Sequence, residues 1–267
     1  MKWFPSGKKD IRLDNEHERI QIAGDMLQQA AEELQGKDKK PERIYFLQEI
    51  RDAVTCSNLI SSLNNSEIKL ASISSFNNGG AKDWQQTAIL TSLPVLDAEY
   101  EAWHNEDGIS PPRGFTYALL SYKDGYIACF SIHLKSNLNR DGSVYGEQLN
   151  IFKRESSARQ LLNKIKEIKE KYSDKKVCVL IAGDFNTNID NPQFVSEDTL
   201  RSLYAAHYRS CFRDIKLKDR VTCPGKGEYP DATFDYILYK DFSTVPETKI
   251  FDGNAISDHH IVTMKIE

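Results

Sequence analysis

Polar side chains that can bind a metal ion or transfer a proton lie where apolar runs of this sequence end or begin. Sites in α/β proteins usually lie where the chain leaves a sheet, so we expect these side chains to meet at one sheet edge. Asp235 opens one apolar run. The clusters that follow apolar runs are Gln48-Glu49, His133, Gly183-Asp184-Phe185-Asn186-Thr187 and Ser257-Asp258-His259.

Together these residue types supply what metal-assisted hydrolysis of a phosphodiester requires. A hard divalent cation prefers carboxylate oxygen and keeps several waters, which suits Glu49 with water and phosphate oxygens as the other ligands. Asp184 could orient or deprotonate the attacking water, and Asn186 could fix its position. An imidazole held by a carboxylate could neutralise the pentacovalent oxyanion.

Each cluster alone also fits an interpretation without catalysis. A Glu after a strand is most often a solvated strand end, and a lone His is more often structural. The sequence Asp-Phe-Asn alone is typical of a turn whose polar side chains cap the next element. The order and combination of the clusters favour the catalytic interpretation.

The elements that must position these residues alternate between helices and strands. After a short first strand, Asp14 or Asn15 can cap a helix whose apolar residues, Ile20 to Leu34, recur at helical spacing. The dipeptide Asp124-Gly125 predicts a two-residue hairpin turn because Gly accepts the positive φ of a primed turn. Further helices are predicted over 53–63, 148–172 and 197–206, and strands over 44–47, 67–74, 87–90, 99–103, 116–123, 126–133, 177–182, 234–239, 245–251 and 260–266.

Two of these segments have a distinctive pattern. The run 177–182 is apolar without alternation, which indicates a central strand covered on both faces. Lys and Glu alternate in the helix 148–172, which is typical of a solvated face and not of a nucleic-acid patch. Interleaved helices and strands indicate a layered α/β fold, and the absence of a linker favours one domain over 1–267.

Composition narrows the class of protein. The 267 residues are 40% hydrophobic and 28% charged, with 35 Lys and Arg against 39 Asp and Glu and a net charge of -4. This is the composition of an ordinary globular protein, which excludes collagen, coiled coil and bulk disorder. No run of about 18 apolar residues predicts a membrane span, and the first ten residues lack the apolar stretch of an export signal. An exported mature form stays open, so no compartment is predicted. The mild acidity argues weakly against indiscriminate coating of nucleic acid but leaves room for a local basic cleft.

The five cysteines form no Cys-x-x-Cys pair. Cys129 and Cys178 lie in apolar runs and are expected to be buried, whereas Cys211 and Cys223 could form a disulfide in an oxidising compartment. Because five is odd, at least one thiol has no partner within the chain.

The sequence resembles the endonuclease/exonuclease/phosphatase superfamily, whose members have the DNase I-like fold. The resemblance implies a four-layered α/β sandwich, two packed mixed β-sheets flanked by helices, with the site at one end. The motifs that carry it span nearly the whole chain in the family's order: LQEIRD (47–52), SIHLKS (131–136), GDFNTN (183–188), TFDYILY (233–239) and SDHH (257–260).

The resemblance also implies roles for single residues. Glu49 matches the Mg²⁺-binding Glu, with Mn²⁺ as a substitute ion, and Asp258 matches a carboxylate at or beside the metal. Asp184 and Asn186 match the pair that activates and positions water. His259 matches the essential C-terminal His, Asp235 the carboxylate that orients it, and His133 a phosphate-contacting His. By strand alternation, His260 should face away.

Two arginines are candidates for substrate contact. Arg51 follows the Glu at the spacing of deoxyribonucleases, although an ion pair with Asp52 or Glu42 is an equal alternative. Arg113 precedes a strand and could contact phosphate, or could be an ordinary loop residue. Gln85-Gln86 could line the cleft, whereas His104 matches no role.

One position departs from the family pattern. Phe4 stands where the first strand of the family carries an Asn that supports the metal, and Ser6 follows it. We favour the interpretation that Ser6 or a water replaces the missing ligand over a weakened metal site, because every other catalytic position is filled.

These features predict a metal-dependent phosphodiesterase, a nuclease acting as a monomer on DNA, with RNA as the second candidate substrate. The alternative keeps the chemistry but takes a sphingomyelin-type phospholipid, an inositol phosphate or another small phosphoester. The acidic charge favours that alternative slightly, whereas the lack of an apolar membrane-inserting hairpin disfavours a lipid. A third hypothesis, suggested by Phe4, is a catalytically silent binding protein.

Overall fold

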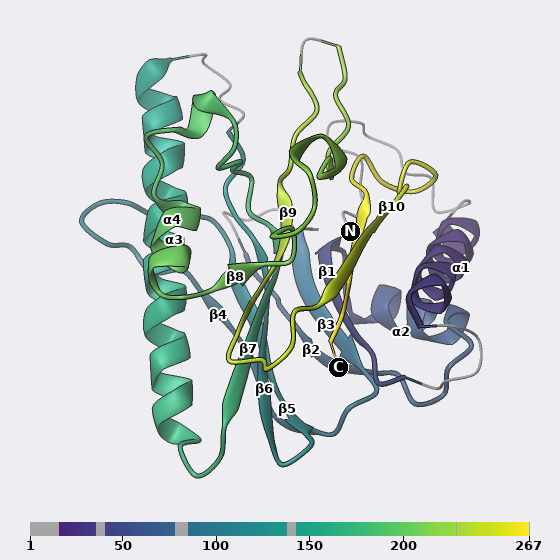
Figure 1. The fold of residues 1–267 in the computed structure, drawn as a ribbon. Helices are drawn as coiled ribbons and strands as arrows, with labels where there is room; N and C mark the ends of the chain where they lie inside the picture. Colours follow the sequence, from purple (N-terminus) through teal and green to yellow (C-terminus); the bar gives the residue numbers. More distant parts are fainter. Residues whose placement is uncertain (1–15, 36–40, 78–84, 138–142, 228, 267) are drawn as a thin grey trace.

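The larger of the two strand layers is a six-stranded sheet with the order β4-β5-β6-β7-β9-β8 (Figure 1). The structure is a computed structural model and describes residues 16–35, 41–77, 85–137, 143–227 and 229–266. Neighbouring strands are antiparallel except β6 and β7, which are parallel and joined by the long helix α3 (Val144–Lys171). The strands are β4 (Val95–Ala102), β5 (Gly114–Tyr122), β6 (Gly125–His133), β7 (Val177–Asp184), β8 (Arg209–Ser210) and β9 (Asp235–Lys240).

The second strand layer has two antiparallel parts. One is the sheet β1-β3-β2, and the other is the pair β10-β11. Helices α1 (Glu16–Gln35) and α2 (Ala53–Ser62) cover this layer, while α3 and α4 (Thr199–Ala205) cover the larger sheet (Figure 1). No helix in the described part of the chain is long and apolar enough to cross a membrane. The strands are β1 (Ile44–Ile50), β2 (Lys69–Ile73), β3 (Gln86–Thr91), β10 (Glu247–Phe251) and β11 (Ile261–Lys265).

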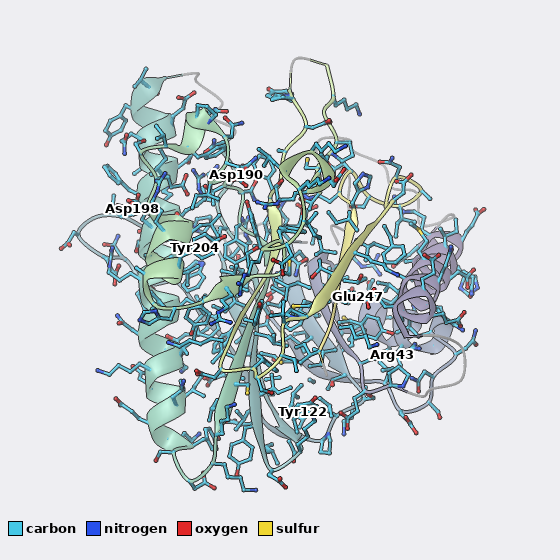
Figure 2. The ribbon with its side chains drawn as sticks, viewed as in Figure 1. Arg43, Tyr122, Asp190, Asp198, Tyr204 and Glu247 are labelled. Carbon is cyan, nitrogen blue, oxygen red and sulfur yellow. The ribbon has the colours of Figure 1, made fainter. Side chains whose placement is uncertain are left out.

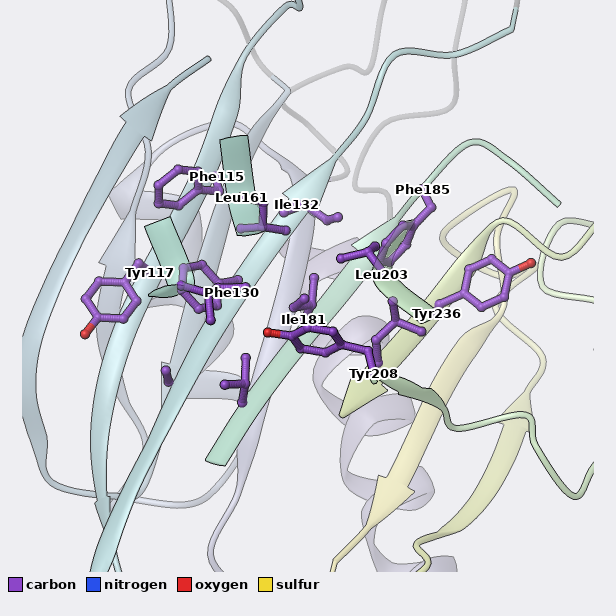
Figure 3. Close-up of a cluster of buried hydrophobic side chains, with 14 of the residues drawn as sticks. Phe115, Tyr117, Phe130, Ile132, Leu161, Ile181, Phe185, Leu203, Tyr208 and Tyr236 are labelled. Atoms are coloured by element: carbon purple, nitrogen blue, oxygen red, sulfur yellow. The ribbon is translucent and has the colours of Figure 1, made fainter. Parts of the chain in front are cut away.

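Three buried hydrophobic clusters separate four layers. The cluster around Phe130 lies between the larger sheet and helices α3 and α4 (Figure 3). Ile89 and Leu180 belong to the cluster between the two strand layers. Leu47 and Leu59 belong to the cluster beneath α1 and α2. Because each layer buries an apolar face against the next, the fold is the four-layered α/β sandwich of packed sheets that the sequence predicts.

The hairpin between β5 and β6 forms as predicted, but its turn residues differ. Tyr122 pairs with Gly125, so the turn is Lys123-Asp124, and the positive φ of 52° belongs to Lys123. Gly125 is the first residue of β6. A Cβ there would lie 2.6 Å from the carbonyl oxygen of Lys176, so the Gly is required by close packing and not by the turn.

Several element boundaries also differ from the prediction. Strand β4 begins at Val95 instead of residue 99, and β1 extends beyond residue 47 to Ile50. Helix α3 begins at Val144 instead of residue 148, because the Ser143 side chain accepts a hydrogen bond from the backbone of Gly146 and caps the helix. The expected first strand and the caps Asp14 and Asn15 lie outside the described residues.

All five cysteines are free thiols in this structure. Cys129 is buried as predicted, but Cys178 is only partly buried, and its thiol lies 3.3 Å from the carbonyl oxygen of Asp241. The prediction for Cys178 was wrong because this strand position faces the edge near Asp241. Cys211 and Cys223 do not form the conditional disulfide.

A buried ion pair ties α3 to the segments around it. Arg154 is fully buried and donates from Nε and Nη2 to the two carboxylate oxygens of Glu197, at 2.8 and 2.5 Å. Its Nη1 donates to the backbone carbonyl of Lys135, two residues after His133. The pair therefore fixes the chain that leaves β6.

Removal of one partner should destabilise the fold. We expect Arg154→Met to lower the free energy of unfolding by about 3–5 kcal/mol, because the Glu197 carboxylate stays buried without its cation. The double variant Arg154→Met/Glu197→Leu should recover most of that loss. Urea denaturation measures both, and a single variant within about 1 kcal/mol of wild type would contradict this account.

Candidate active site

Glu49 occupies a β-bulge at the end of β1. Gln48 pairs with Thr87 and Ile50 pairs with Gln86, so Glu49 is an extra residue on its strand, with a φ of 56°. A bulge re-aims its side chain out of the usual alternation. Glu49 is 2% exposed, so it is not the solvated strand end of the alternative interpretation.

Strand register brings three further residues together. His133 pairs with Asp184 across β6 and β7, and Asp184 pairs with Asp235 across β7 and β9. Gly183 makes this register possible, because a Cβ there would lie 2.0 Å from the carbonyl oxygen of Ile132. The side chains of His133, Asp184 and Asp235 therefore lie side by side at the same end of three neighbouring strands of the larger sheet.

Short contacts connect the candidate residues across both strand layers. Glu49 Oε1 lies 3.8 Å from His133 Nε2, and the same nitrogen lies 3.7 Å from Asp184 Oδ2. His259 Nδ1 lies 2.6 Å from Asp235 Oδ2. All five side chains are buried. Segments that are far apart in the sequence, from Glu49 to His259, therefore converge in one buried polar cluster, which we call the pocket.

Asn186 forms the turn that follows β7. Its backbone has a φ of 52°, and its N–H donates to Asp184 Oδ1 at 2.8 Å. Its side-chain Nδ2 donates to the carbonyl of Leu134 at 3.0 Å. The sequence Asp184-Phe185-Asn186 therefore forms a capped turn and also contributes to the pocket. The structural and the catalytic interpretation of this motif are compatible.

The Arg113 side chain is buried and makes hydrogen bonds to the residues that form the pocket. The residue is 8% exposed and has a φ of 67°. Its guanidinium donates to the carbonyls of His133 and Leu134 and, from Nη1, to Gln85 Oε1 at 2.7 Å. Gln85 Nε2 in turn donates to Glu49 Oε1 at 3.1 Å. Arg113 therefore orients Glu49 through Gln85, and its contact with phosphate stays a prediction.

Arg51 makes ion pairs on the protein surface. It contacts Asp52, as the alternative interpretation expects, at 2.9 Å. Its second partner is Glu16 of α1 and not Glu42. The role of Arg51 toward substrate stays a prediction.

The residues beside His259 differ in exposure. Asp258 is exposed and makes no hydrogen bond or ion pair with any residue that the structure describes, so its metal role also stays a prediction. His260 turns toward Gly253, whose N–H lies 3.1 Å from its Nδ1, and so faces away from Asp235 as expected. His104 is exposed and contacts Glu101.

Thr222 holds the Asp235–His259 pair, and sequence reasoning missed it. Its hydroxyl accepts hydrogen bonds from the backbone N–H groups of Phe234 and Asp235. Its backbone carbonyl accepts a hydrogen bond from the backbone N–H of His260. No spacing or motif marks Thr222, because it lies in an irregular segment. Phe4 and Ser6, the predicted departure from the family pattern, lie outside the described residues.

The groups around His259 favour its protonated form. Burial is the largest influence and lowers its pKa, but the charge and hydrogen bond of Asp235, with help from Cys223 and Asp184, raise the pKa to about 11. When the ring is protonated, Nδ1 donates to Asp235 Oδ2 and the other ring nitrogen is a second donor.

The pocket suits a divalent cation that brings its own water. The carboxylates of Glu49, Asp184 and Asp235 are buried close to one another, with His259 paired to Asp235. No three His, Cys, Asp or Glu side chains are grouped to enclose a metal within the described ranges. Mg²⁺ needs no such cage, since it is usually held by one or two carboxylates, waters and substrate phosphates. Glu49 fits that donor set.

Solved structures resemble this chain over nearly its whole length. An endonuclease/exonuclease/phosphatase family protein from Leptotrichia buccalis gives a TM-score of 0.62 at 16% identity, covering 95% of this chain and 94% of that one. Truncated TDP2 from Caenorhabditis elegans gives 0.60 at 14% identity over 94% and 91%. Beta toxin from Staphylococcus aureus gives 0.60 at 16% identity over 95% and 93%. No family model and no curated protein matches the sequence. The chain therefore has the DNase I-like fold that its motifs suggest.

Replacement of Asp235 should lower the pKa of His259. In Asp235→Asn the charge that favours the imidazolium is lost while burial remains, so we expect a fall of roughly 1–3 pH units. The pKa of His259 is higher in the folded state than its unfolded value near 6.5, so protonation of the ring stabilises the folded protein. That stabilisation is complete below pH 6.5 and is lost as the pH rises toward 11.

Histidine NMR titration of the wild type and Asp235→Asn measures the shift directly, with His104 as an internal control. The unfolding free energy of the wild type should also fall between pH 7 and 11 more steeply than that of Asp235→Asn. An unchanged His259 titration in the variant would contradict the pairing.

Proposed function

We propose that this chain is a divalent-metal-dependent phosphodiesterase that hydrolyses DNA or RNA. The observation that carries the proposal is the connected set of buried groups, with Glu49, His133 and Asp184 in one series and Asp235 paired with His259. The family name of the Leptotrichia buccalis protein, which denotes nucleases and phosphatases, supports the same class of chemistry.

Glu49 would hold the metal ion, which supplies positive charge to a phosphoryl oxygen when bound. Gln85 fixes one carboxylate oxygen of Glu49 by a hydrogen bond, and Arg113 fixes Gln85. The chain thus presents the carboxylate in one orientation before substrate arrives, and such preorganisation reduces the reorganisation needed during the reaction.

Asp184 would orient the attacking water and accept its proton. Its Oδ1 accepts the Asn186 backbone N–H, which leaves Oδ2 on the side of His133. The amide of Asn186 is held by the carbonyl of Leu134 and would position the water. His133, between two carboxylates, would contact a phosphate oxygen.

His259 would stabilise the charge that develops on the phosphoryl oxygens. Its Nδ1 is bound to Asp235, so the ring presents Nε2 as the donor toward substrate. A buried charged donor is stronger than the same group in water, because the low dielectric screens it less. Asp235 acts by keeping the imidazole protonated and oriented.

Asp184 and His259 should both be required for activity. We expect Asp184→Ala and His259→Ala each to reduce the turnover of bis(p-nitrophenyl) phosphate with Mg²⁺ or Mn²⁺ by roughly a hundredfold or more, because they handle the proton and the oxyanion. His104→Ala, an exposed histidine of the same type, is the matched control and should keep wild-type turnover. Equal turnover in His259→Ala and wild type would refute the role of His259.

A substrate panel separates the alternatives. The proposal predicts that the wild type with Mg²⁺ or Mn²⁺ cleaves single-stranded DNA, duplex DNA or RNA faster than sphingomyelin or inositol phosphates. Preference for one of the latter would make the chain a small-phosphoester enzyme. No hydrolysis of any substrate, with folded protein, would leave a binding protein on this scaffold.

A further inference from the structure

The segment between β8 and β9 is rich in basic residues. Residues 209–226 carry six Arg or Lys against two Asp, whereas the whole chain has a net charge of -4. The segment runs from β8 to the hairpin that precedes β9, and β9 opens with Asp235 of the pocket (Figure 1). The basic residues are Arg209, Arg213, Lys216, Lys218, Arg220 and Lys226.

Three of these arginines line a cavity of about 400 Å³. Arg220 pairs with Asp190 at 3.0 Å, so its charge is compensated. Arg213 is exposed and lies 3.9 Å from Asp214, and Arg209 is exposed and makes no ion pair with any described residue. The cavity therefore has an excess of guanidinium charge, and guanidinium groups recognise phosphate through paired hydrogen bonds.

Three aromatic residues also line that cavity. Tyr204 of α4 and Tyr236 of β9 line it together with Phe212, and Figure 2 shows Tyr204 and Asp190 on the same side of the molecule. Guanidinium groups beside aromatic rings suit a ligand that carries both a phosphate and a flat ring.

The lysines of α3 have a different environment. Lys164 pairs with Glu99 and Glu101, Lys169 with Asp241, and Lys171 with Asp97, which are carboxylates of the larger sheet and its loops. Their charges are largely neutralised, in agreement with the solvated face that the sequence predicts. The arginine-lined cavity is therefore distinguished by uncompensated charge and not by the number of basic residues alone.

The hairpin after the cavity carries an exposed aromatic ring next to a cation. Lys226 and Tyr229 are directly opposed, with hydrogen bonds of 3.0 and 3.2 Å, so their side chains share one face. Tyr229 is 67% exposed. The base of the hairpin is Thr222, which binds the backbone of Asp235, so the hairpin is anchored at the pocket. Figure 1 shows it projecting beyond the end of β9.

We propose that this basic surface, residues 209–226 with Tyr229, binds a single-stranded nucleic acid whose scissile phosphate lies in the active-site pocket. The arginine-lined cavity takes a backbone phosphate, and Tyr229 stacks on an unpaired base. A duplex offers no free base face to an exposed ring, whereas a single strand does. The inference rests on the proposed function, because it names the substrate of that pocket.

Binding measured without hydrolysis tests this surface. A fluorescein-labelled 20-nucleotide single strand is titrated with protein in EDTA at several salt concentrations. Arg209→Ala/Arg213→Ala should bind more weakly, with a slope of log K against log salt that is smaller by roughly 0.7 for each phosphate that the variant no longer neutralises. Tyr229→Ala should weaken binding by roughly fivefold to a hundredfold, and Tyr229→Phe should restore it.

The matched control removes two cations elsewhere. Lys123 and Lys175 lie against Tyr122 and Tyr126, and Figure 2 shows Tyr122 at the opposite end of the molecule from Asp190. Lys123→Ala/Lys175→Ala changes the net charge as the double arginine variant does, and it should keep wild-type affinity and slope. Circular dichroism confirms that each variant is folded.

The outcomes separate this inference from the proposed function. Wild-type affinity and salt slope in Arg209→Ala/Arg213→Ala would overturn the cavity assignment, and so would an equal loss of affinity in the control. Tighter binding of duplex, with no effect of Tyr229→Ala, would overturn the single-strand assignment. The proposed function is judged independently, from wild-type hydrolysis of bis(p-nitrophenyl) phosphate.

Discussion

Burial of three carboxylates in one pocket is the constraint on which the remaining structure depends. An isolated buried carboxylate costs several kcal/mol, so each one needs a partner. Asp235 has the imidazolium of His259, Asp184 has the backbone of its own turn, and Glu49 has Gln85. These partners orient the groups, and a divalent cation bound at Glu49 would further reduce the repulsion between the carboxylates. The same electrostatics explains both the proposed metal and the high pKa of His259.

The layered fold supplies the rigidity that this charge requires. Glu49, Arg113 and Asn186 all have positive φ, a conformation that costs a non-glycine residue of order 1–3 kcal/mol and persists only where surrounding packing imposes it. Each lies at the end or start of a strand or in the turn after one, next to a buried cluster. The buried Arg154–Glu197 pair fixes the neighbouring chain through the carbonyl of Lys135. Backbone strain in the pocket is therefore balanced by packing elsewhere.

The sequence was most informative where apolar runs end. The positions of Glu49 and Asp184 could be predicted because a change from apolar to polar residues marks the exit from a sheet, and the fold class followed from interleaved periodicities. His259 lies in the loop before β11, so its motif and not the end of a strand identified it. Features that depend on pairing could not be predicted. The bulge at Glu49 depends on the register of β1 against β3, and the inward direction of Arg113 depends on carbonyls of another strand. Neither leaves a signal in local sequence.

The central claim is that Glu49 would hold a divalent cation in the pocket that also contains His133 and His259. Paramagnetic broadening of histidine NMR signals by Mn²⁺ tests it most directly. At low Mn²⁺ the ring signals of His133 and His259 should broaden while that of exposed His104 stays sharp, and Glu49→Ala should abolish the selective broadening. Broadening that is equal in all three histidines, or that persists in Glu49→Ala, would contradict the account.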